Sequence, residues 1–119
     1  MKDFRTLDVW IKAHACTLAI YKATRSFPKE EKFGITSQLQ RACVSVPTNI
    51  SEGCGRNGDK ELKRFLEIAM GSASETEYLI LLARDLQYCD ETTFQKLADD
   101  ITEVKRMLAS FIGRLTADS

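Results

Sequence analysis

Residues 45–53 read SVPTNISEG, and this stretch decides how the rest of the chain must be arranged. It lies inside an apolar pattern with helical spacing, yet it contains Pro47 and several polar residues. A proline within a helix removes one backbone hydrogen bond and crowds the carbonyl four residues earlier, here that of Cys43, at a cost of about 3 kcal/mol. We therefore expect neighbouring helices to enclose this segment and to make use of the bend.

Three polar residues of the same stretch share one face of the expected helix. Ser45, Asn49 and Glu52 follow the i, i+4, i+7 steps that align side chains along a helix. Because Ser and Asn are poor helix formers, we expect this row to be buried in hydrogen bonds across helices or across subunits. A solvated face is the alternative interpretation.

Apolar residues recur at helical spacing along nearly the whole chain. Thr36 or Ser37 is the expected N-cap of the helix that contains Pro47, and Asp90 is the expected N-cap of the last helix. The expected helices run from Asp8 up to Pro28, from Thr36 or Ser37 to Cys54, from Asp59 to Leu86 or Gln87, and from Asp90 to Leu115.

The last helix has the clearest pattern, a heptad seam in which apolar residues alternate steps of three and four. Its members are Phe94, Leu97, Ile101, Val104, Leu108, Phe111 and Leu115. No segment shows sustained alternation at period two, so no sheet is expected. Four helices with short connections predict one all-α domain over residues 1–119, an antiparallel up-down-up-down four-helix bundle.

The first helix is apolar over an unusually wide part of its circumference. One stripe contains Leu7, Trp10, Ile11, His14, Leu18 and Tyr21, and an adjoining stripe contains Val9, Ala13, Cys16, Ile20 and Ala23. A helix of this kind touches neighbours on two sides, which predicts partners outside its own chain. We expect His14 to be a partly buried core or interface residue.

Small residues interrupt the apolar stripe of the third helix at positions 71–74, which read GSAS. They would let another backbone approach closely, plausibly the segment around Pro47, with a helix-propensity cost of about 1 kcal/mol for Gly71. Ser72 and Glu75 lie on the same side of this helix. We expect both to meet the row formed by Ser45, Asn49 and Glu52.

The chain carries 17 basic and 17 acidic residues, so a strong overall attraction to nucleic acid or to anionic membranes is absent. The first 64 residues nevertheless carry twelve Lys and Arg against seven Asp and Glu, and the remainder carries five against ten. This asymmetry could orient subunits, or it could reflect two solvated faces. The start of the chain has no signal-peptide pattern and no apolar run is long enough to span a bilayer, which predicts a cytoplasmic protein without membrane contact.

Five basic residues lie around the connection between the second and third helices. A ring of subunits would repeat this cluster and raise its avidity for RNA or DNA, although interleaved acidic residues also fit ordinary surface charge. The candidate nucleic-acid contacts are Arg41, Arg56, Lys60, Lys63 and Arg64.

The sequence offers little support for an enzyme or for a cofactor. Glu52 and Glu75 could form a carboxylate pair, but a di-iron bundle needs repeated Glu-x-x-His steps that the single His14 cannot supply. The glycines of residues 53–58 match no phosphate loop. Cys16, Cys43, Cys54 and Cys89 have no CxxC spacing and are expected to be small buried hydrophobes. We expect no metal, cofactor or small-molecule substrate.

Together, these residues resemble the four-helix bundle proteins of the 23S rRNA intervening-sequence family. The resemblance rests on SVPTNISEG at 45–53, on LQRA at 39–42 before it, on Gly55 and Arg56 after it, and on AMGS at 69–72 with Glu75. It extends from Phe4 to the heptads of the last helix.

The resemblance implies a bacterial protein, a left-handed up-and-down bundle and a ring-shaped homopentamer, with no enzyme activity. The family is similar to the accessory protein of diversity-generating retroelements, which partners a reverse transcriptase and RNA. By the same resemblance, a structural or subunit-contact role is expected for Ser45, Pro47, Asn49, Glu52, Ser72 and Glu75.

Overall fold

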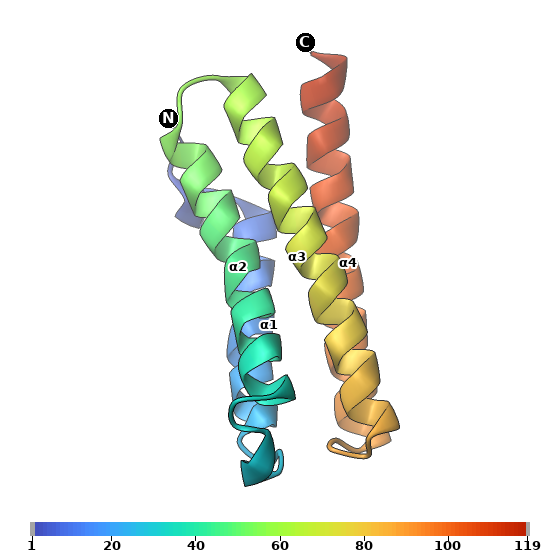
Figure 1. Cartoon of the computed structure of the whole chain (residues 1–119). Helices are drawn as coiled ribbons and strands as arrows, with labels where there is room; N and C mark the ends of the chain where they lie inside the picture. The colour runs from blue at the N-terminus through green and yellow to red at the C-terminus, as the bar shows by residue number, and fades with distance from the viewer. Residues whose placement is uncertain (1, 119) are drawn as a thin grey trace.

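The computed structural model describes residues 2–118 and has an all-α fold (Figure 1). The elements, in chain order, are the 3-10 helix η1 (Phe4–Thr6), α1 (Asp8–Thr24), the 3-10 helix η2 (Lys29–Glu31), α2 (Ile35–Gly55), α3 (Asp59–Asp85) and α4 (Glu91–Ala117). No strand occurs between residues 2 and 118. The predicted fold class is therefore confirmed.

The four long helices lie side by side, and short connections at alternating ends make successive helices antiparallel, as Figure 1 shows. The molecule measures 45 × 22 × 20 Å. Both α1 and α3 pack against α2 and α4, whereas no close backbone contact joins α1 to α3 within residues 2–118. The bundle is thus up-down-up-down, with α1 and α3 at opposite corners.

The heptad seam of α4 faces the centre of the bundle, as predicted. Leu97, Ile101, Val104 and Leu108 are each at most 3% exposed, Leu115 is also buried, and Phe94 and Phe111 are half-buried. Fully burying an aliphatic side chain of this size stabilises the fold by about 1.5–3 kcal/mol. The seam therefore supplies one continuous wall of the core.

The two predicted helix starts have different outcomes. Asp90 caps α4 as predicted, because its Oδ1 accepts a 2.7 Å hydrogen bond from the Thr93 N–H. The prediction of Thr36 or Ser37 as the cap of α2 is wrong, since α2 already begins at Ile35. A carboxylate oxygen of Glu31, four residues upstream, accepts instead from the Ile35 N–H at 3.4 Å.

The Glu31 carboxylate also joins the two connections at one end of the bundle. Tyr88, which follows α3, donates its hydroxyl proton to the second carboxylate oxygen of Glu31 at 2.7 Å. Hydrogen bonding to Glu31 is the main reason that the pKa of Tyr88 lies above its ordinary value. The α1–α2 and α3–α4 connections are thereby held together.

The small-residue run at 71–74 does contact α2, since Ser72 lies 2.9 Å from Ser45. The glycine at which α2 and α3 approach closely is however Gly53, and Gly71 takes no part. A Cβ placed on Gly53 would lie 2.9 Å from Cβ of Phe65 and 3.1 Å from Cδ1 of Leu62, both on α3. A Cβ on Gly71 would meet nothing within 4 Å, because Gly71 is exposed. Ala69 and Ala73, which flank it, are the small residues that α3 buries.

Replacing these two glycines by alanine is expected to have opposite effects on stability. Gly71→Ala should stabilise the protein by up to about 1 kcal/mol, because alanine is the better helix former at an open position. Gly53→Ala should destabilise it, since overpacking costs about 1–3 kcal/mol and outweighs the same propensity gain. Thermal unfolding followed by circular dichroism measures both, and equal shifts for the two variants would contradict the close approach at Gly53.

Candidate functional site

Pro47 is buried inside α2, and the helix continues through it without a break. Because proline has no N–H, the Cys43 carbonyl lacks its helical donor. Thr17 on α1 supplies the missing hydrogen-bond donor, because its Oγ1 lies 3.1 Å from the Cys43 carbonyl oxygen. The same hydroxyl lies 2.9 Å from the Ala13 carbonyl oxygen, which already accepts a backbone N–H in α1. The Cys43 carbonyl therefore depends on Thr17 more than the Ala13 carbonyl does.

Thr17 is a residue that the sequence-based predictions missed. It is 8% exposed and lies in the stripe of α1 that packs against α2. The proline identified which carbonyl needed a donor, and this was the only available signal. The proline did not identify the donor, because several polar residues on the two neighbouring helices could have reached this carbonyl.

The serine and asparagine of the polar row are joined to each other and to α3. Ser72 Oγ donates to Ser45 Oγ at 2.9 Å, and Asn49 Nδ2 donates to the Ser45 carbonyl at 2.8 Å and to its Oγ at 3.0 Å. All three residues are half-buried. The predicted contact between this row and Ser72 is confirmed, and its hydrogen bonds lie within one chain.

The two glutamates of the motif do not join this network. Glu52 is exposed and forms a 3.2 Å ion pair with Arg56, four residues later at the end of α2. Glu75 is exposed on α3. Because Ser45 and Ser72 face each other on antiparallel helices, Glu52 and Glu75 lie about 15 Å apart along the bundle at 1.5 Å per residue. The prediction that Glu52 is buried is therefore wrong for the single chain, and so is the suggestion that Glu52 and Glu75 form a carboxylate pair.

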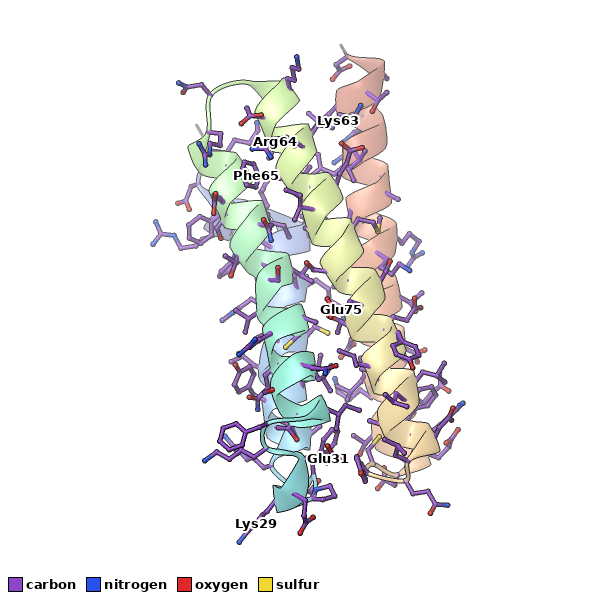
Figure 2. The ribbon with its side chains drawn as sticks, viewed as in Figure 1. Lys29, Glu31, Lys63, Arg64, Phe65 and Glu75 are labelled. Carbon is purple, nitrogen blue, oxygen red and sulfur yellow. The ribbon has the colours of Figure 1, made fainter. Side chains whose placement is uncertain are left out.

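The basic cluster gathers at the end of the bundle where α2 joins α3, and Figure 2 labels Lys63, Arg64 and Phe65 there. The guanidinium carbons of Arg56 and Arg64 lie 5.1 Å and 4.5 Å from the centre of the Phe65 ring. Arg64 also pairs with Glu61 at 3.0 Å, which lowers the pKa of that exposed carboxylate. Both arginines therefore already have acidic and aromatic neighbours.

Lys60 and Lys63 make no ion pair within residues 2–118, and they line an open cleft with Asp59, Leu115 and Asp118. Arg41, in contrast, is about 22 Å from Arg56 along α2, at 1.5 Å per residue. The predicted five-residue cluster is thus a four-residue cluster at the end of the bundle, and Arg41 stands apart from it.

One face of α1 is largely apolar and is left uncovered by the rest of residues 2–118. Ile11 is 49% exposed, Leu18 is 59% exposed and Tyr21 is 41% exposed, and they recur with His14 on one side of the helix. We call Ile11, His14, Leu18 and Tyr21 the α1 face. The imidazole of His14 is itself exposed and stacks on the Trp10 ring with 4.9 Å between ring centres. The expectation of a partly buried His14 is therefore wrong for the single chain.

No group of three or more His, Cys, Asp and Glu side chains in residues 2–118 is arranged to hold a metal ion. Cys16, Cys43 and Cys54 are buried and Cys89 is half-buried. Burial raises the pKa of Cys16 to about 11 and that of Cys43 to about 12, so both remain protonated and poorly nucleophilic at neutral pH.

Asp100 is the acidic side chain that fixes α1 to α4. Its carboxylate pairs with Lys12 at 3.1 Å and with Lys96 at 2.8 Å. Burial alone would raise the pKa of Asp100, but hydrogen bonds from both lysines outweigh it and hold the pKa below its ordinary value. Asp100, Lys12 and Lys96 therefore form an ion-pair network with a structural role.

In residues 2–118, the helices also fall short of the length and apolar character that crossing a membrane requires. The features described so far define a class, a compact antiparallel four-helix bundle with a buried proline inside its second helix. The chain belongs to the 23S rRNA-intervening sequence protein family, whose model it matches over residues 5–110. The family resemblance inferred from the SVPTNISEG motif is thus confirmed.

A solved structure shares this fold and much of this length. It is that of a protein with unknown function from the S23 ribosomal protein family of Bacteroides thetaiotaomicron VPI-5482, with a TM-score of 0.82 and 26% identity. The similarity covers 88% of this chain and 95% of that chain. No curated protein matches the chain.

The dependence of Cys43 on Thr17 can be tested with a double-mutant cycle. Thr17→Val should destabilise the protein by about 1–3 kcal/mol, because it leaves a buried carbonyl without a donor. In a Pro47→Ala background the loss should shrink, since residue 47 then supplies its own N–H. Urea unfolding of the four proteins measures the coupling.

Thr76→Val is the matched control for this cycle. Thr76 is also fully buried, but its hydroxyl donates to the Ser72 carbonyl of its own helix at 2.8 Å, and that carbonyl keeps its backbone donor. The loss of stability caused by Thr76→Val should be the same whether residue 47 is proline or alanine. An equal effect of Thr17→Val in both backgrounds would contradict the assignment.

Proposed function

We propose that this protein is a non-enzymatic scaffold that assembles in the bacterial cytoplasm into a homo-oligomeric ring, most simply a pentamer. The observation that carries the proposal is the α1 face, which leaves three large apolar side chains 41–59% exposed on one helix. A contiguous exposed apolar surface of this kind marks an interaction site. A ring would bury one such face in every subunit.

The polar motif supports this proposal in a different way. Ser45, Asn49 and Ser72 are bonded to one another, so they fix α2 against α3 and position the outer surfaces. Glu52 and Glu75 remain exposed carboxylates on these two helices. We assign Pro47 and the hydroxyl and amide residues a structural role, and the two glutamates a role in contacts with other subunits.

Burial raises the pKa values of the Cys16 and Cys43 thiols, so both are poor nucleophiles. A scaffold needs only a rigid body and repeated surfaces. The 45 Å rod, with a basic cluster at one end and the η2 connection at the other, would display each end once per subunit (Figure 2).

Light scattering tests the assembly directly. The parent protein should have a mass several times that of the 13.4 kDa chain, and five times that mass for a pentamer. Leu18→Glu should reduce the mass to that of one chain while the far-ultraviolet circular dichroism stays unchanged, because a charge enters an exposed apolar face. A parent protein of 13.4 kDa at micromolar concentration would refute the proposal.

Binding of RNA is the second candidate function. The observation that favours it is the cluster of Arg56, Lys60, Lys63 and Arg64 at one end of the bundle, where the two lysines make no ion pair in residues 2–118. In a ring, the cluster would recur once per subunit, and several weak phosphate contacts would act together. The partner would be RNA or a protein bound to nucleic acid.

A salt series distinguishes this function from ordinary surface charge. Fragments of 23S ribosomal RNA should bind to the parent protein with an affinity that falls as salt rises, because phosphate contacts release counterions. Lys60→Glu with Lys63→Glu should abolish binding, whereas Lys29→Glu, at the opposite end of the rod, should not. Affinity that is undetectable at low salt, or equal for both variants, would argue against RNA binding.

A further inference from the structure

The α1 face has a counterpart of similar chemistry on the other side of the bundle. A groove of about 370 Å³ runs between α3 and α4 and is lined by Ser74, Glu77, Tyr78, Leu81, Phe94 and Ala98. We call it the α3–α4 groove. Tyr78 is 57% exposed and Leu81 is 39% exposed, so no helix or connection of residues 2–118 covers these side chains.

We infer that neighbouring subunits join head to tail, with the α1 face of one subunit seated in the α3–α4 groove of the next. The inference rests on the proposed ring and specifies its contact. The α1 face is a convex row at positions i, i+3, i+7 and i+10 of one helix. An apolar helix face with this spacing is the shape that a hydrophobic groove between helices receives.

The placement of the two surfaces favours this contact over a symmetric one. Since α1 and α3 occupy opposite corners of the bundle, the α1 face and the α3–α4 groove point away from each other. A contact between two different surfaces leaves one of each free at the ends, so it repeats from subunit to subunit and gives a ring when the rotation between subunits closes. A contact between two α1 faces would stop at a dimer.

Charges beside the two surfaces are complementary. Lys22 and Arg25 each lie one turn beyond an α1-face residue and are exposed. Around the groove, Glu75, Asp85 and Glu91 each lie one turn from a groove residue and are also exposed. The opposing exceptions are Asp8 at the start of α1 and Arg84, whose guanidinium pairs with Asp85 at 3.1 Å and lies 4.4 Å from the centre of the Phe94 ring. Glu75 and Glu91 are therefore the acidic charges beside the groove that remain for a neighbouring subunit.

These local charges follow the division of the whole chain. The first 64 residues, which contain α1 and α2, carry twelve basic against seven acidic residues, and the rest carries five against ten. A head-to-tail contact places the basic half of one subunit against the acidic half of the next. Complementary potentials of this kind set the orientation of partners more than they add affinity.

The larger cleft on the surface fits the α1 face less well. It has a volume of about 510 Å³ and lies between the start of α1 and the second half of α4. Its lining includes the charged side chains of Asp8, Glu103, Arg106 and Arg114. Glu103 and Arg106 pair with each other. Asp8 and Arg114 make no ion pair within residues 2–118, and seating an apolar row there would remove their charges from water without supplying partners. The α3–α4 groove has one charged lining residue, Glu77, which Lys105 already pairs at 2.9 Å.

A mixing experiment with two dissociated variants tests the inference. Leu18→Glu damages the α1 face and Tyr78→Glu damages the groove, and both positions are exposed enough for the fold to tolerate a charge. Each variant alone should sediment as a single 13.4 kDa chain. An equal mixture should form a one-to-one dimer over a concentration series, because one intact face remains on each variant and they complement each other once.

Ser110→Glu is the matched control, since it adds the same charge at an exposed position of α4 outside both surfaces. It should keep the mass of the parent, and circular dichroism should be unchanged for all three variants. A Tyr78→Glu protein with the mass of the parent, a mixture that stays monomeric, or dissociation by Ser110→Glu would each overturn the head-to-tail contact. A parent that is itself monomeric would instead refute the proposed ring.

Discussion

A single backbone group, the carbonyl of Cys43, governs how the centre of this bundle is arranged. Pro47 removes the helical donor of this carbonyl, and a buried carbonyl without a partner would destabilise the fold by about 1–3 kcal/mol. The Thr17 hydroxyl satisfies it from α1 at 3.1 Å. The proline therefore makes α2 dependent on its neighbour, so that α1 must lie at a fixed height and rotation against α2.

The same constraint determines which faces remain outside. Once Thr17 points at α2, the stripe of α1 that contains Ile20 is buried and the stripe that contains Leu18 faces solvent. On the other side of α2, the hydrogen bonds of Ser45 and Ser72 fix the rotation of α3. Tyr78 is left exposed by that rotation. The polar groups inside the bundle are paired by contacts between its own helices. The exposed apolar side chains lie on two opposite sides of the bundle, and a scaffold that binds copies of itself would use these two surfaces.

Much of the fold follows from local patterns. The heptads of α4 predicted its buried wall because side chains three and four residues apart share a helix face wherever the helix is placed. Asp90 was predicted as a cap because its partner, the Thr93 N–H, is only three residues away. The start of α2 was not predicted correctly, because the Glu31 carboxylate reaches it from the preceding connection. Glu31 is itself held by Tyr88, which lies in another part of the chain.

The candidate site divides along the same line. Helical spacing was enough to place Ser45, Asn49 and Ser72 where they meet, but spacing does not distinguish an inward row from an outward one. Glu52 is the example, because it extends the row by one step and yet is exposed and pairs with Arg56, although the adjacent Gly53 packs against α3. Antiparallel packing also separates it from Glu75, a distance that no single helix can encode.

The sequence by itself determined four amphipathic helices, their connections, the family and the position of the unpaired carbonyl, because each depends on residues within a few turns of one another. Only the tertiary structure decided that Thr17 is the donor, that Gly53 and not Gly71 admits the neighbouring helix, and that Leu18 and Tyr78 face outward. These facts depend on the rotation and height of each helix against the next. Those variables are set by packing between residues far apart in the chain.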